Sequence, residues 1–201
     1  DGTLRYHKGD VVDTVTTNED GKAKSKELYL GKYTVVETKA PNGMVINKEK
    51  HSVELTYAGQ DVAVTETATS FVNERQKVKI SLEKVLEQNE TFGIGKNDKI
   101  KNISFGLYAK EDIVSSSGTV IPADGLIEII TLDENGTATA NTDLPFGSYY
   151  IKEIATDEHY ILSDTQYPFT FEYAGQDTET VEIKVNDGKP IENKLIYGSV
   201  S

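Results

Sequence analysis

The stretch that decides the fold is residues 33–43, which read YTVVETKAPNG. Five of its first six residues are aromatic or β-branched, and successive side chains alternate between two faces. This pattern predicts a half-buried β-strand. Alternation also places Glu37 on the same face as Tyr33 and Val35. If those two point inward, Glu37 is buried and needs a partner, because a lone buried carboxylate is costly; the alternative is a Glu that faces solvent.

The same kind of strand recurs later in the chain. Three blocks occur in the same order at offsets of 116, 116 and 115: residues 31–40 with 147–156, 57–61 with 173–177, and 18–23 with 133–138. Ordered blocks at a nearly constant offset indicate an internal repeat. We therefore expect an incomplete domain at residues 1–75 and a complete one at residues 76–197. Residues 198–201 would be the start of a further repeat or a tail.

Period-two alternation also predicts strands at residues 52–57, 78–85, 169–172 and 181–185. Asp20-Gly21 and Asn135-Gly136 predict tight hairpin turns, because Asn or Asp followed by Gly tolerates a positive φ. No long amphipathic helix is evident. Short strands joined by regular turns predict an all-β fold of two tandem antiparallel β-sandwiches, the first of them lacking its N-terminal strand.

The composition narrows the classes of partner. The 201 residues carry a net charge of −12, whereas binding to nucleic acid or to an anionic membrane would need a basic patch. No apolar run is long enough to span a bilayer. We expect any secretion or sorting signal to lie outside this sequence. Cysteine is absent, so a crosslink in a small extracellular β-domain would need chemistry other than a disulfide.

Three polar residues of the second repeat end or interrupt an apolar stripe. On residues 78–84 every second side chain is apolar until Lys84, and on residues 191–195 Asn193 lies between two apolar residues of its face. Glu153 is the counterpart of Glu37. Each residue alone is commonly a strand end that has reached solvent. All three within one repeat indicate a shared buried site.

In their order, these blocks resemble the Cna B-type domains, the prealbumin-like β-sandwiches of Gram-positive adhesins and SpaA-type pilins. Residues 33–43 resemble the E-box of that family, with Glu37 as the E-box Glu, and residues 80–84 resemble its first strand. Residues 105–108 resemble the strand after its first loop, and residues 144–149 the entry to its E-box strand. The resemblance covers essentially the whole chain and implies a prealbumin-like sandwich.

In that family a Lys on the first strand and an Asn on the last form a covalent amide, assisted by the E-box Glu. The resemblance implies that Lys84 is the nucleophile, Asn193 the electrophile and Glu153 the proton shuttle, with no cofactor or metal. Burial disfavours the charged forms, so a proton can pass from the amine to the carboxylate, and the neutral acid can hydrogen-bond the Asn carboxamide. The second repeat departs from the E-box, since no Ala-Pro step follows Glu153. Asn186 is a rival for Asn193, but the Asp-Gly that follows it is typical of a turn.

The first repeat carries only part of this set. Glu37 matches the E-box Glu, and Asn73 matches the closing Asn. At the offset of 116 the matching Lys would fall before residue 1, and Lys8 and Lys22 lie in turn-like contexts. We expect an open groove in this repeat, which a strand of another copy or a separate N-terminal piece could fill by β-augmentation.

The leading hypothesis is a structural stalk or pilus module on the cell wall of a Gram-positive bacterium. Its partners would be neighbouring domains or subunits of the same surface protein or pilus. The alternative is an adhesin module that binds host extracellular matrix or glycan through loop residues such as Tyr6, His7, His159 and Tyr160, which we otherwise expect to be ordinary surface residues. No enzyme is expected beyond a single autocatalytic bond, because the His residues lack metal-ligand spacing and no phosphate loop or nucleophile elbow is present.

Overall fold

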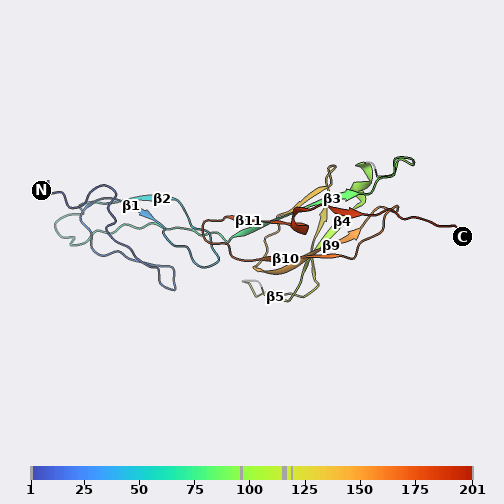
Figure 1. The fold of residues 1–201 in the computed structure, drawn as a ribbon. Coiled ribbons are helices and arrows are strands. Elements are labelled where there is room, and N and C mark those ends of the chain that lie inside the picture. Colours follow the sequence, from blue (N-terminus) through green and yellow to red (C-terminus); the bar gives the residue numbers. More distant parts are fainter. Residues whose placement is uncertain (1, 96, 115–116, 119, 201) are drawn as a thin grey trace. The chain divides into compact units, whose positions relative to one another are not determined.

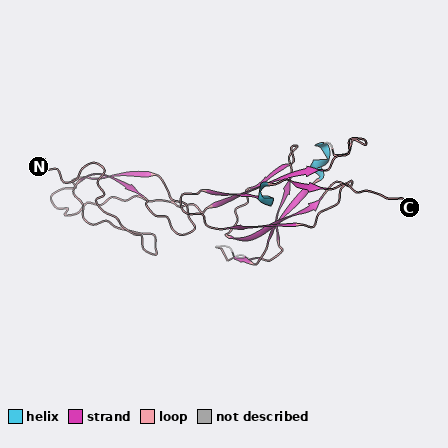
Figure 2. Cartoon of the chain, viewed as in Figure 1, coloured by secondary structure: helices cyan, strands magenta, loops and turns pink. Residues whose placement is uncertain are grey.

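The computed structural model describes residues 2–95, 97–114, 117–118 and 120–200. These residues form β-strands and two short 3-10 helices (Figure 1, Figure 2), so the predicted all-β class is confirmed. The chain divides into two compact units. Unit 1 contains residues 1–38 and 47–72, and unit 2 contains residues 39–46 and 73–201. Residues 39–46 follow the first E-box strand in sequence but pack with unit 2.

Unit 1 contains one two-stranded antiparallel sheet in its described part. Strand β1 (Gly31–Val36) pairs with β2 (Lys50–Leu55), with Tyr33 opposite Val53. Both of those side chains are half-buried, whereas Val35 is 36% exposed. None of the described side chains of this unit is fully buried. Since a lone two-stranded sheet is marginally stable in water, unit 1 depends on packing beyond this pair of strands.

Unit 2 is a β-sandwich with a well-packed core. One sheet has the order β10-β9-β4-β7, and the other has β11-β3-β12 with β8 also paired to β3. Their bounds are β3 (Lys77–Leu86), β4 (Ser104–Ala109), β7 (Leu126–Thr131), β8 (Thr137–Ala140), β9 (Gly147–Ala155), β10 (Gln166–Phe171), β11 (Thr180–Lys184) and β12 (Ile191–Asn193). A small hairpin, β5 (Ile113–Val114) with β6 (Val120–Ile121), and the helices η1 (Asn97–Asn102) and η2 (Val185–Gly188) complete the unit.

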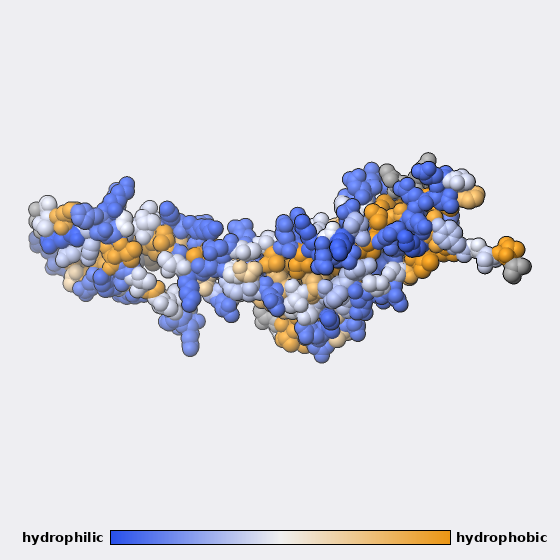
Figure 3. Space-filling model, in the orientation of Figure 1, coloured by the Kyte–Doolittle hydropathy of each residue, from blue (hydrophilic) through white to orange (hydrophobic). Residues whose placement is uncertain are grey.

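The core lies between the two sheets. Side chains at alternate positions of β3 are buried, as period-two patterning predicts, and they pack against residues of β4 and β9 such as Phe105, Leu107 and Ile151. Each of these three is 0% exposed. Hydrophilic residues are spread over much of the face seen in Figure 3, in keeping with the net charge of −12. In the described part of the chain the helices are single short 3-10 segments, and neither is long and apolar enough to cross a membrane.

Two strand pairs of unit 2 are parallel, although the sequence predicted antiparallel sheets. β11 and β12 both pair with β3 in the parallel sense, while β8 pairs with it in the antiparallel sense. The break between β11 and β12 is the turn η2, in which Asn186 and Asp187 have φ of 57° and 54°. The first and last strands of the unit therefore run side by side in the same direction.

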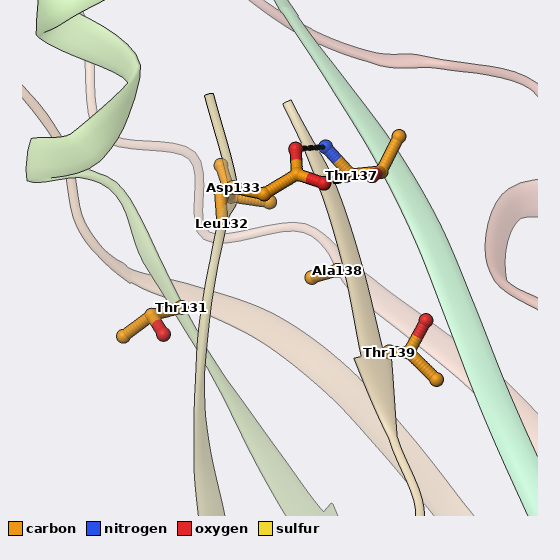
Figure 4. A pocket seen from close by; sticks show the side chains of 6 residues that line it. All are labelled: Thr131, Leu132, Asp133, Thr137, Ala138 and Thr139. Carbon is orange, nitrogen blue, oxygen red and sulfur yellow. Dashed lines mark hydrogen bonds between the residues drawn. The ribbon is translucent and has the colours of Figure 1, made fainter. Parts of the chain in front are cut away.

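The predicted turn at Asn135-Gly136 is tight, but it does not join neighbours of one sheet. It connects β7 of one sheet to β8 of the other. Asp133 accepts the backbone N–H groups of Asn135 and Thr137 at 2.8 and 2.9 Å and the Thr137 hydroxyl at 2.7 Å. Asp133 and Thr137 line a surface hollow together with Thr131, Leu132, Ala138 and Thr139 (Figure 4). The Asp133 carboxylate accepts hydrogen bonds from its own turn, so we assign this hollow a structural role at the corner of the sandwich.

Gly136 fixes the backbone that carries the candidate nucleophile. Its φ is 77°, and a Cβ added there would lie only 2.4 Å from the Lys84 carbonyl oxygen and 2.6 Å from Ile100. The Lys84 N–H donates to the Gly136 carbonyl at 2.7 Å. Only glycine combines this positive φ with such close approach.

Candidate functional site

Lys84 is the last fully buried residue of the inward-facing β3 stripe, and it is 1% exposed. Its Nζ donates to the carbonyl oxygens of Val85 at 3.0 Å and Ile191 at 3.1 Å. Ile191 is also its register partner on β12. Within the described residues, both hydrogen bonds of this amine go to backbone carbonyls and neither goes to a carboxylate. The amine is therefore held at the junction of the first and last strands without an ion pair.

Burial changes the acidity of this amine. It lowers the pKa of Lys84 from 10.5 to about 8, since a buried ammonium loses its hydration, while the charges of Glu153 and Glu192 act in the opposite direction. A substantial fraction of Lys84 is then neutral at mildly alkaline pH. Only the neutral amine has a lone pair with which to attack a carbonyl carbon.

Glu153 and Asn193 are both 2% exposed and contact each other directly. The Asn193 Nδ2 donates to Glu153 Oε1 at 2.8 Å and to Oε2 at 2.9 Å. It also lies 2.9 Å from the Thr156 hydroxyl. The Ser163 N–H donates to Glu153 Oε2 at 3.0 Å, which fixes the carboxyl plane. The nitrogen that would leave in an amide exchange is thus held against a group able to carry a proton.

The carboxamide oxygen of Asn193 is in a different situation. Oδ1 is buried, and among the described residues it has no hydrogen-bond partner. Leaving a buried acceptor unsatisfied costs about 1–3 kcal/mol. The sequence-based mechanism expected the acid to hydrogen-bond the carboxamide and polarise its carbon, whereas here the carboxyl contacts its nitrogen. A half-turn of the carboxamide would exchange the two atoms and bring the oxygen to Glu153.

Thr156 is a site residue that the sequence reasoning missed. It follows β9 and is half-buried, and it meets Asn193 only because the chain turns after Glu153. The alignment places it opposite Ala40, so the first repeat gave no signal for a hydroxyl here.

Tyr160 was expected to be an ordinary surface residue, and this was wrong. It is 3% exposed, and its hydroxyl donates to the Glu87 carbonyl at 2.9 Å. Tyr160 also forms an isolated antiparallel β-bridge with Leu195, near the end of the unit. His159 beside it is half-buried and lies 2.7 Å from the Asp157 carboxylate. Asn186 forms a turn as predicted, with its Nδ2 donating to the Lys189 carbonyl at 3.1 Å.

The corresponding residues of the first repeat are divided between the units. Glu37 is in unit 1, where it accepts the Asn47 N–H at 2.6 Å. Asn73 is in unit 2, where its Nδ2 donates to the Val45 carbonyl at 3.0 Å. The Glu37 contact repeats the contact of Glu153 with Ser163 at the same offset of 116. The two glutamates therefore accept a backbone N–H from equivalent positions of the two repeats.

The lowered pKa of Lys84 predicts a pH dependence of stability in a chain that cannot form the crosslink. In Asn193→Ala, the folded state binds fewer protons than the unfolded state between about pH 8 and pH 10.5. The free energy of unfolding should therefore rise with pH across that window, by up to about 3 kcal/mol. Urea titrations at a series of pH values measure it. The double variant Asn193→Ala/Lys84→Met shows how much of the pH dependence comes from groups other than Lys84. If the free energy of unfolding changed equally with pH in both variants, the lowered pKa of Lys84 would be contradicted.

The comparisons with known proteins agree with this fold. A family model described as the SpaA prealbumin-like fold domain matches residues 3–70 and 90–189. The trypsin-resistant surface T6 protein of Streptococcus pyogenes serotype M6 is 29% identical over 139 residues, covering 67% of this chain and 24% of that protein. The chain thus spans about a quarter of the curated relative.

Solved structures show the same kind of likeness. The Bacillus anthracis TIE protein aligns with a TM-score of 0.55 and 24% identity, over 90% of this chain and 28% of that chain. GBS52, the minor pilin of Streptococcus agalactiae, aligns over 93% of this chain and 69% of that chain, with 21% identity and a TM-score of 0.39. The family model spans well over half of the residues, and the chain belongs to the SpaA prealbumin-like fold domain family.

Proposed function

We propose that this chain is a structural module of a Gram-positive surface pilus or stalk, closed by an autocatalytic amide bond between Lys84 and Asn193. The observation that carries the proposal is the buried contact of the Asn193 Nδ2 with both carboxylate oxygens of Glu153, beside an amine whose pKa burial lowers to about 8. The relatives are named as a surface T protein and as pilins, which supports a structural role.

The reaction joins the Lys84 Nζ to the Asn193 Cγ and breaks the Cγ–Nδ2 bond. The neutral Lys84 amine attacks, and Glu153 passes the proton that this nitrogen gives up on to Nδ2, which leaves as ammonia. One amide is exchanged for another, so no oxidant, reductant or cofactor is consumed. Folding alone brings the groups together, and such intramolecular placement is equivalent to effective molarities of about 10⁵–10⁸ M. The step occurs once per molecule and is maturation of the chain, with no turnover.

A bond at this place suits a domain under tension. β3 and β12 are the first and last strands of unit 2 and lie side by side in parallel. A pull applied to the two ends of the unit would enter through β3 and leave through β12. The bond would carry that force directly, and the 108 residues between Lys84 and Asn193 would stay folded. We further propose that the chain lies on the bacterial cell wall and joins neighbouring domains or subunits of the same surface protein.

The experiment that tests the proposal is the intact mass of the purified chain. We expect a mass short by one ammonia relative to the sequence, and the full calculated mass in Lys84→Met. Lys79→Met is the matched control, because Lys79 lies on the same strand but is exposed, and it should keep the deficit. A digest should contain one branched peptide that joins the segments around residues 84 and 193.

A full mass in the unmodified chain would contradict the crosslink. Lys84, Glu153 and Asn193 would then be a buried polar cluster with no covalent role. A deficit that persisted in Lys84→Met would place the bond on another lysine.

A further inference from the structure

The pentapeptide YAGQD occurs once in each unit and forms the same turn in both. We call residues 57–61 the unit 1 motif and residues 173–177 the unit 2 motif. The Val62 N–H donates to the Gly59 carbonyl at 3.3 Å, and the Thr178 N–H donates to the Gly175 carbonyl at 3.4 Å. The two glycines have φ of 111° and 92°. In both units the carbonyl of the motif's own glycine therefore closes the turn.

In unit 2 the motif is occupied by the chain segment 40–46. The Gln176 side-chain oxygen accepts the Ala40 N–H at 2.9 Å, and its backbone carbonyl accepts the Ile46 N–H at 2.9 Å. The Tyr173 hydroxyl donates to the Met44 carbonyl at 2.9 Å. Ala40 is only 7% exposed as a result. All three bonds reach backbone groups of the segment, so its side chains are not what the motif recognises.

In unit 1 the same motif faces solvent. Tyr57 is 68% exposed and Gln60 is exposed, whereas their counterparts Tyr173 and Gln176 are half-buried. Two side chains that bind a backbone segment in one unit are thus presented on the surface in the other.

The chain also carries a second segment with the form of the bound one. Residues 156–162 follow the Glu153 strand as residues 40–46 follow Glu37, and three backbone hydrogen bonds recur between equivalent positions. Around the first segment the N–H groups of Met44, Val45 and Gln76 donate to the carbonyls of Pro41, Glu74 and Gly43, respectively. Around the second segment the N–H groups of Tyr160, Ile161 and Ile196 donate to the carbonyls of Asp157, Lys194 and His159. The C-terminal end of this second segment presents apolar side chains to solvent, with Ile161 56% and Leu162 52% exposed, and the neighbouring Ile196 is 59% exposed.

We propose that the unit 1 motif of one chain binds segment 156–162 of a second copy of the chain. By equivalence, Gln60 would accept the N–H groups of Thr156 and Leu162, and the Tyr57 hydroxyl would donate to the Tyr160 carbonyl. Each copy presents one motif and one segment, so the contact is heterologous and joins copies head to tail. The inference rests on the part of the proposed function that makes this chain a structural module joined to neighbouring subunits. It does not depend on the bond between Lys84 and Asn193.

One difference sets the expected strength. In unit 2 the buried Gln76 supports the motif, donating to the Gly175 and Thr178 carbonyls and accepting the Ala174 N–H. Its counterpart beside the second segment is Ile196, which can make none of these bonds. Contact within one chain also benefits from an effective concentration in the millimolar range. We therefore expect weak association between separate copies, visible at high protein concentration.

The test is a series of amide spectra of the ¹⁵N-labelled chain from micromolar to millimolar concentration, with sedimentation velocity on the same samples. The amides of Gly59, Gln60 and Val62 should shift together with those of residues 156–162, and the weight-average mass should rise. Tyr57→Ala should weaken the association at least about tenfold, since it removes a hydrogen bond and a contact ring. The exposed residue Val11, changed to Ala, is the matched control and should leave it unchanged.

The proposal is overturned if the chain stays monomeric with unchanged spectra at millimolar concentration, or if Tyr57→Ala associates as well as the unmodified chain. Repeating the series with Lys84→Met separates the two claims. Association in this variant supports the docking contact whatever the intact mass says about the crosslink. A mass deficit in a chain that never associates supports the crosslink alone.

Discussion

Lys84→Met is expected to lower the thermal unfolding midpoint of unit 2 by roughly 15–20 °C. Closing a loop of about 100 residues removes conformations from the unfolded chain and is worth about 4.7 kcal/mol in the chain-entropy model, which corresponds to a shift of this size in a domain of this length. Methionine fills nearly the same space as the lysine stem and removes a buried amine. The substitution by itself should therefore be neutral or stabilising, and a large fall is attributable to the lost bond.

Calorimetry of the unmodified chain, Lys84→Met and the exposed control Lys79→Met measures this effect. Asn193→Ala should fall at least as far as Lys84→Met, because it prevents the same bond and also leaves the Lys84 amine buried. A midpoint in Lys84→Met equal to or above that of the unmodified chain would mean that Lys84 is only a buried amine that weakens the fold.

The second large effect is expected for Glu153→Gln, which should slow bond formation by about 10²–10⁴-fold. Gln has the shape of Glu and can still accept a hydrogen bond from the Asn193 Nδ2, so the fold should be retained. It cannot take the proton of the attacking amine or deliver one to the departing nitrogen. The fraction of chains that lack one ammonia, followed by mass spectrometry at intervals after synthesis, measures the rate.

Glu37→Gln is the matched control for this variant. Glu37 occupies the equivalent strand position and accepts the Asn47 N–H just as Glu153 accepts that of Ser163. It belongs to unit 1, whereas Lys84 and Asn193 belong to unit 2. Its substitution should leave the rate unchanged. Complete crosslinking of Glu153→Gln at the earliest time measured would remove Glu153 from the reaction.

Much of this site could be predicted because it lies on strands with strong patterning. Alternation along residues 78–84 placed Lys84 on the inner face, and its side chain is 1% exposed. Alternation also placed Asn193 between two apolar residues of its face, whereas Glu153 was expected inside only as a member of the same shared site; each is 2% exposed. A period of two fixes the face of a residue whatever its partners are, so these predictions needed no knowledge of the strand order.

The strand pairing and the lesser site residues could not be predicted in the same way. The parallel pairing of β12 with β3 joins segments more than 100 residues apart, and no local pattern reports it. Thr156 and Tyr160 lie in the turn after β9, where the direction of a side chain depends on the path of the loop. The turn at Gly136 was recognised from its residues, but the sheets it connects depend on how the whole sandwich closes.

The order of the strands determines when, during synthesis and folding, the crosslink could form. β3 is the first strand of unit 2 to be made and β12 is the last. With the proposed bond, Lys84 waits through 109 residues of synthesis for its partner, and during that time the chain is linear and can be threaded through a narrow channel. Docking of β12 supplies Asn193 and completes the sandwich in one event. The crosslink would then form only in a domain that has completed its fold.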